Sequence, residues 1–129
     1  MRAVDTNLIV RIFAKDDAEQ TARAVAFIDA GDVWIPMSVI LEAEWVLRSA
    51  YRAAPQKICR LLRSLLGLPG LHVENAEDVS QALDWFEQGM DFADALHLAS
   101  ARHCERLATF DRDFIRAAAR IGAGNVAEP

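Results

Sequence analysis

The sequence predicts an α/β fold in which a parallel sheet is covered by helices on both faces. Short apolar strands alternate with longer helical segments along the whole chain, an order that is typical of such sheets. The length of 129 residues and the hydrophobic content of 53% are sufficient for a substantial core. No internal repeat or Pro/Gly-rich linker divides the chain. We therefore expect a single domain over residues 1–129.

The first part of the chain carries local signals that begin and end its elements. Gly31 closes an amphipathic helix, Pro36 stops a short strand, and Pro55 stands in the first turn of a helix. In the helix before Gly31, the side chains expected to face the core are Ala22, Val25, Ala26 and Ile28. The predicted elements are strand 2–5, helix 6–14, helix 16–30, strand 33–35, helix 38–52 and helix 55–66.

The cluster Gly67-Leu68-Pro69-Gly70 predicts a turn between a helix and a strand. The second part of the chain continues the same alternation. Its predicted elements are strand 71–74, helix 76–88, helix 91–104, strand 106–110 and helix 113–120.

Four acidic side chains occupy positions where an α/β protein usually exposes its chemistry: Asp5, Glu42, Asp94 and Asp111. Two of them follow predicted strands, and ligands of open parallel sheets bind beyond the carboxyl ends of the strands. The other two lie on helices that can line the same edge. Carboxylates that gather without a cation repel one another, and Mg²⁺ prefers oxygen ligands. We therefore expect a divalent metal site that performs phosphoryl chemistry.

Each acid in the first part of the chain also has a structural interpretation. Asp5 is a good N-cap for the helix that begins at Thr6, although Thr6 and Asn7 add oxygen atoms that suit a hydrated cation. Glu44 has Arg48 four residues later and is expected to be its ion-pair partner at the surface. Glu42 has no such partner and stands among apolar neighbours. We therefore expect a partly buried, functional carboxylate at Glu42.

The acids of the second part allow similar alternatives. Asp91 is expected to cap a helix, with Asp94 in its first turn, so that Asp94 is the ligand candidate and Asp91 an accessory acid. Asp113 is placed to cap the helix that begins at Phe114, which leaves Asp111 free for a ligand role. The choice between Asp111 and Asp113 as the fourth acid stays open.

Charge and cysteine content limit the class of protein. The net charge of −5 argues against indiscriminate DNA coating, but bound divalent ions would offset most of it, and paired arginines can form a local basic rim. The two cysteines, Cys59 and Cys104, lack metal-site spacing and are expected to be packed, reduced thiols of a cytoplasmic protein. We expect neither a membrane span nor a signal peptide.

Taken together, these stretches resemble the PIN-domain family, specifically the VapC-type toxins of VapBC toxin–antitoxin pairs. The resemblance covers essentially the whole chain. It rests on four stretches in order: Val4-Asp5-Thr6-Asn7, Leu41-Glu42-Ala43-Glu44-Trp45-Val46-Leu47-Arg48, Asp91-Phe92-Ala93-Asp94-Ala95-Leu96-His97-Leu98-Ala99 and Ala108-Thr109-Phe110-Asp111.

The resemblance implies an α/β/α sandwich and a Mg²⁺- or Mn²⁺-dependent endoribonuclease with one or two metal ions. It also implies a homodimer and a cognate small antitoxin protein. The acidic quartet of the family corresponds to Asp5, Glu42, Asp94 and Asp111, with Asp91 as an extra acid. The threonine before its last acid corresponds to Thr109.

We expect metal-assisted hydrolysis of an RNA phosphodiester, with Arg112 among the residues that hold the RNA backbone. One alternative is a phosphotransferase that uses Asp5 as nucleophile, although Lys15 and Lys57 stand in no supporting motif. The other is a non-catalytic PIN-like binding module.

Overall fold

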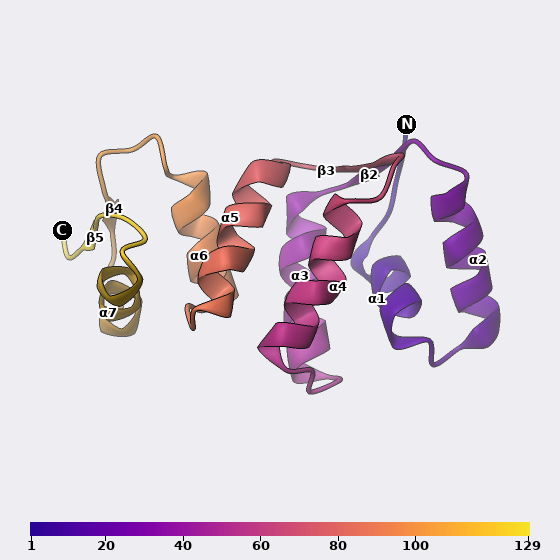
Figure 1. The fold of residues 1–129 in the computed structure, drawn as a ribbon, viewed down its shortest axis with the longest axis horizontal. Coiled ribbons are helices and arrows are strands. Elements are labelled where there is room, and N and C mark those ends of the chain that lie inside the picture. Colours follow the sequence, from indigo (N-terminus) through magenta and orange to yellow (C-terminus); the bar gives the residue numbers. More distant parts are fainter. The chain divides into compact units, whose positions relative to one another are not determined.

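The computed structural model describes all 129 residues. The chain forms two compact units, Met1–Ala76 and Glu77–Pro129, called the first unit and the second unit below. Each unit contains its own parallel sheet and its own helices (Figure 1). No helix in the structure combines the length and the apolar character that a membrane span needs.

Three parallel strands form the sheet of the first unit: β1 (Arg2–Ala3), β2 (Val33–Ile35) and β3 (Leu71–Val73). The order is β1-β2-β3, so β2 is central. Val33 and Ile35 of β2 are fully buried, because helices cover the sheet that these side chains face. The predicted parallel sheet is confirmed, and each of its strands is shorter than or equal to the predicted range.

Four helices belong to the first unit: α1 (Thr6–Ala14), α2 (Ala18–Asp29), α3 (Met37–Ser49) and α4 (Pro55–Leu66). α1 packs against both α2 and α3, and α3 packs against α4 (Figure 1). Ile9, Ile40, Ile58 and Leu62 are almost completely inaccessible to solvent. Each such side chain contributes about 1.5–3 kcal/mol of hydrophobic stabilisation when it leaves water.

The predicted core face of α2 is wrong in three of its four positions. Ala22, Val25 and Ala26 are exposed, whereas Ile28 is buried as expected. The buried stripe is Ala24 and Ile28, one helical turn apart. α2 packs mainly against a single neighbour, α1, so only this narrow stripe is covered. The many alanines of α2 made its apolar face look wider than it is.

The turn at residues 67–70 forms as predicted and depends on glycine. Gly70 has a φ of +80°, which glycine adopts without strain. A Cβ atom at this position would lie 3.1 Å from the Cα atom of Gly31. This close approach allows the carbonyl of Gly70 to accept a hydrogen bond from the amide of Val33 at 2.9 Å. The turn therefore brings β3 into register beside β2.

Three helices and two strands build the second unit: α5 (Ala76–Glu87), α6 (Phe92–Ser100), β4 (Leu107–Ala108), α7 (Arg112–Ile121) and β5 (Val126–Ala127). Phe86 and Phe92 meet edge to face, with ring centroids 5.5 Å apart, at the base of the α5–α6 pair. β4 and β5 pair in parallel. The strand β5 is absent from the sequence prediction.

Two boundaries of the second unit differ from the prediction. The helix predicted for residues 91–104 ends at Ser100, and turns follow it. Cys104 therefore lies outside the helix and is exposed, so the expectation of a packed thiol is wrong there; Cys59 is buried, and neither cysteine forms a disulfide. The strand predicted for residues 106–110 shrinks to Leu107–Ala108 because only these residues pair with β5.

Candidate active site

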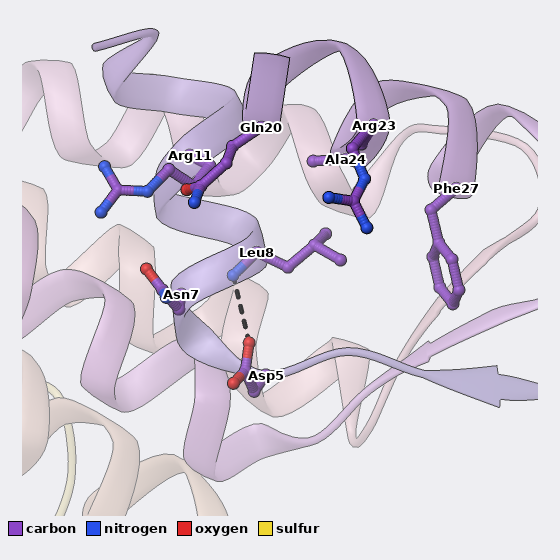
Figure 2. A pocket seen from close by; sticks show the side chains of 8 residues that line it. All are labelled: Asp5, Asn7, Leu8, Arg11, Gln20, Arg23, Ala24 and Phe27. Carbon is purple, nitrogen blue, oxygen red and sulfur yellow. Dashed lines mark hydrogen bonds between the residues drawn. The ribbon is translucent and has the colours of Figure 1, made fainter. Parts of the chain in front are cut away.

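Asp5 stands at the junction of strand and helix and caps α1. Its backbone is extended, with φ −101° and ψ 178°, and its Oδ1 accepts a hydrogen bond from the Leu8 amide at 3.1 Å (Figure 2). The predicted N-cap is thus confirmed. Oδ2 has no hydrogen-bond partner, and the residue is exposed. One oxygen holds the helix, and the other is free for a ligand.

Thr6 links α1 to Glu42 of α3. Its hydroxyl donates a hydrogen bond to Glu42 Oε1 at 2.5 Å. Thr6 is buried, but Glu42 is exposed. The expectation of a partly buried Glu42 is therefore wrong, because its side chain leaves the apolar face of α3 and turns to the Thr6 hydroxyl. The hydrogen bond orients Glu42 without neutralising its charge.

Glu44 has the opposite environment from the one expected. Its side chain is almost fully buried, and its Oε2 accepts from Arg48 Nε at 2.7 Å. The predicted ion pair is confirmed, but its acid does not lie at the surface. Burial of a charge is costly unless a partner satisfies it, and Arg48 supplies that partner. Glu44 is thereby assigned a structural role.

A hollow of about 560 Å³ lies between α1 and α3 and is called the α1–α3 hollow. Its size is within the range of small-molecule sites. Its lining residues are Asp5, Thr6, Asn7, Val10, Arg11, Glu42, Val46, Ala50 and Tyr51. All four oxygen-bearing residues that the sequence indicated in this unit therefore face one space.

In the second unit, Asp91 and Asp94 stand at the start of α6. Asp91 caps the helix, as predicted, and accepts a hydrogen bond from the Asp94 amide at 3.1 Å. Asp94 is half-buried, and burial raises the pKa of its carboxyl group, as do the negative charges of Asp91 and Asp111, while His97 lowers it. The negative charges of two carboxylates thus act on a third, Asp94, in this unit.

Asp111, not Asp113, caps α7. Its Oδ1 accepts from the amides of Asp113 and Phe114, at 3.0 and 3.2 Å, so the predicted cap at Asp113 is wrong. The helix begins at Arg112, two residues before the Phe114 start that a cap at Asp113 implies, and this moves the cap to position 111. Asp113 is exposed and pairs with Arg116 one turn later. Its charge is therefore compensated.

Thr109 and Arg112 flank Asp111. The Thr109 hydroxyl accepts a hydrogen bond from the Asp111 amide at 3.0 Å and so fixes the turn before α7. The Arg112 side chain is 80% exposed, and its Nε lies 3.9 Å from Glu128 Oε1, a long and weak ion pair. Arg112 is accessible to an anion.

The donor set suits a hard divalent cation. Carboxylate, hydroxyl and amide oxygens are the ligands that Mg²⁺ prefers, and a cation would offset the negative charges of Asp91 and Asp111, which together with burial raise the pKa of Asp94. The structure contains no group of three or more His, Cys, Asp or Glu side chains arranged to hold a metal ion. The chemistry of the residues fits the metal, and the gathering of all four acids at one ion stays a prediction.

A polar network that no sequence pattern indicated lies at the far end of the α1–α3 hollow. Asp16 accepts hydrogen bonds from Arg11 at 2.6 Å and from the Tyr51 hydroxyl at 3.0 Å. The hydrogen bond from Arg11 is the largest cause that lowers the pKa of Asp16, and the same pair raises the pKa of Arg11. These three residues come from separate segments with no helical spacing, so no local pattern could reveal them.

A family model described as PIN domain matches residues 2–120. The match includes residues of both units and all four predicted acids. No curated protein and no solved structure matches the chain significantly.

Proposed function

Because the chain belongs to the PIN-domain family, we propose that it is a Mg²⁺- or Mn²⁺-dependent endoribonuclease that acts as the toxin of a VapBC-type toxin–antitoxin pair in the cytoplasm. The family supports a nuclease-type fold and nucleic-acid binding. The metal-dependent cleavage of RNA and the toxin role are the proposal.

The observation that carries the proposal is the group of carboxylates Asp91, Asp94 and Asp111, in which burial and then the negative charges of Asp91 and Asp111 raise the pKa of Asp94. No basic residue other than His97 acts on Asp94. A protein that keeps repelling carboxylates without compensation usually does so to bind a cation or a proton at a functional site.

In the proposed mechanism, Asp5, Glu42, Asp94 and Asp111 are the metal ligands. A bound divalent ion supplies charge neutralisation at the phosphate and lowers the pKa of a water molecule. Asp5 offers its free Oδ2, since Oδ1 holds the Leu8 amide. Thr6 orients Glu42 through its hydroxyl. Arg112, which is largely exposed, holds the RNA backbone, and Asp91 keeps Asp94 in place through the α6 cap.

Asparagine variants test the mechanism without removing a helix cap, because Asn caps a helix as well as Asp does. Asp5→Asn and Asp94→Asn are each expected to abolish metal-dependent RNA cleavage and to relieve growth arrest on expression. Asp113→Asn is the matched control, because Asp113 is an exposed acid that pairs with Arg116. Cleavage at the control rate by both variants would reject the assignment.

A non-catalytic binding module is the second candidate. It is favoured because no three His, Cys, Asp or Glu side chains in the structure are arranged to hold a metal ion. The two readings differ in metal binding. Calorimetry with Mn²⁺ should show saturable binding to the wild-type chain and weaker binding to Asp94→Asn. A chain that binds RNA but no Mn²⁺ would be a binding module.

The homodimer and the cognate antitoxin also belong to the proposal. Trp45 on α3 is 58% exposed, which is unusual for so large an apolar side chain and typical of an interface. Light scattering of the wild-type chain and of Trp45→Ala measures the oligomeric state. A monomeric wild-type chain at micromolar concentration would contradict the homodimer.

A further inference from the structure

A second hollow, of about 430 Å³, lies on the other side of α1, between α1 and α2 (Figure 2). This α1–α2 hollow shares Asp5, Asn7 and Arg11 with the α1–α3 hollow. Its wall also includes Leu8, Arg23, Ala24 and Phe27. A ligand that reaches Asp5 can therefore extend into a space on either side of α1.

Arg23 is a cation without a partner in this hollow. Glu19 precedes it by four residues on α2, the spacing that commonly gives a helical ion pair, yet the structure forms no ion pair or hydrogen bond at Arg23. Figure 2 shows its guanidinium directed toward the Leu8 side chain of α1. By contrast, Arg11 is paired with Asp16 and Arg2 is bound to backbone carbonyls. An unpaired guanidinium beside the site is free to bind an anion, and phosphate is the anion its geometry suits.

Phe27 forms a rigid apolar wall in the same hollow. The Arg2 guanidinium covers one face of its ring, with Cζ 4.0 Å from the ring centroid. Arg2 is itself fixed, because its Nη2 donates to the carbonyls of Phe27 at 2.9 Å and Gly31 at 2.7 Å. The half-buried ring still lines the hollow. A ring that is already held in place loses little freedom when a flat ligand contacts it.

We propose that the α1–α2 hollow binds one nucleotide of a single-stranded RNA substrate, next to the phosphate that is cleaved. The base contacts Phe27 and Leu8, and the phosphate binds Arg23. The inference rests on the proposed function for the identity of the substrate. It adds a subsite with two positioning residues, Arg23 and Phe27, and a preference for unpaired RNA, because a base within a duplex cannot leave its stack at low cost.

The test measures binding separately from cleavage. Fluorescein-labelled oligouridylate and oligoadenylate of about eight nucleotides are titrated with the full chain in EDTA, by anisotropy, at several salt concentrations. Arg23→Ala is expected to raise the Kd by about tenfold or more, the usual loss for one charge-assisted hydrogen bond. It should also reduce the slope of log Kd against log salt concentration by about 0.7, the value for one phosphate contact on a single strand.

Three further variants separate charge from shape. Arg23→Lys keeps the positive charge and should retain most of the salt dependence. Phe27→Leu should weaken binding while the salt slope stays unchanged, because base contacts carry no charge. Arg60→Ala, an exposed arginine of α4 that lines neither hollow, is the matched control and should bind like the wild type.

The outcomes keep the two proposals distinct. If the wild type cleaves RNA and Arg23→Ala binds it like Arg60→Ala, the subsite is overturned while the nuclease stands. If Arg23 governs RNA binding but no RNA is cleaved, the nuclease falls and the subsite stands. If Arg23→Ala leaves the RNA Kd unchanged but abolishes copurification with the protein of the adjacent reading frame, the hollow belongs to a protein partner and the inference is wrong.

Discussion

Asp94 is the residue at which folding and proposed chemistry conflict most directly. Its carboxyl group is half-buried, and the nearby charges of Asp91 and Asp111 are negative. Each of these conditions favours the protonated form. The proposed metal ligand role requires the ionised form, so the folded chain without metal carries a cost at this position.

The difference in stability between the wild-type chain and an Asp94→Asn variant should therefore depend on pH. The pKa of Asp94 is raised in the folded state, so its stabilising contribution is complete below the ordinary aspartate value of about 3.9 and is lost as pH rises through the folded pKa. At pH 7 in EDTA, Asp94→Asn should be more stable than wild type by about 0.5 kcal/mol, a small value because solvent screens the partly exposed group.

Thermal unfolding of both proteins at pH 7 and at about pH 3.5, which is below the ordinary aspartate pKa of about 3.9, measures this effect. The difference should shrink at the lower pH. An equal gain at both values would show that Asn stabilises through packing or capping and not through charge.

At the scale of the elements, three of the five acids of the predicted site are also the residues that begin helices. Asp5 starts α1, Asp91 starts α6 and Asp111 starts α7, each through its own carboxylate. An alanine at any of these positions removes a cap and a charge together. The effect of the cap and the effect of the charge can be measured separately only when the replacement keeps one of the two.

Asp111→Ser separates them at α7. Serine caps a helix about as well as aspartate, whereas alanine costs about 1 kcal/mol. We expect Asp111→Ser to keep the wild-type free energy of unfolding and Asp111→Ala to lose about 1 kcal/mol, while both variants lose RNA cleavage. Urea denaturation and a cleavage assay provide the two measurements. Full cleavage by Asp111→Ser would confine Asp111 to its structural role and reopen the assignment of the fourth acid.

Helix limits were predictable where the signal is local. The ranges 6–14 and 55–66 match α1 and α4, because Asp5 and Pro55 act on their own neighbours. Strand lengths were not predictable, since a strand ends where its partner ends, and β5 is too short to carry a pattern. The cap of α7 was misplaced by two residues because Asp111 and Asp113 are equally good caps in sequence.

The site was predictable to a similar extent. Asp5 and its neighbours Thr6 and Asn7 are adjacent in sequence, so their shared position was clear. The contact between Thr6 and Glu42 spans 36 residues, and the burial of Glu44 depends on how α3 packs. Neither follows from local spacing. Arg23 was missed because an exposed helical arginine has no distinguishing pattern.

At the scale of the whole molecule, the family match from residue 2 to residue 120 takes in residues of both units. The single domain inferred from the sequence stays a prediction, and it is a prediction about cooperativity. A single domain of this size usually unfolds in one transition.

Two tryptophans report on the two units. Trp34 lies on β2 of the first unit, and Trp85 lies on α5 of the second. In variants that retain only one of them, with Phe at the other tryptophan positions, urea unfolding followed by fluorescence should give coincident midpoints and equal slopes. Two separate midpoints would divide the chain into two domains.

The helix-starting acids also limit how this chain can lose activity through random mutation. Most replacements of Asp5 or Asp111 remove a helix cap, at a cost of about 1 kcal/mol of stability, together with a proposed metal ligand. Asparagine keeps the cap, as serine does, and unlike serine it is reached from the aspartate codons by a single base change. Inactive but well-folded descendants of this sequence therefore arise mainly along that one mutational route.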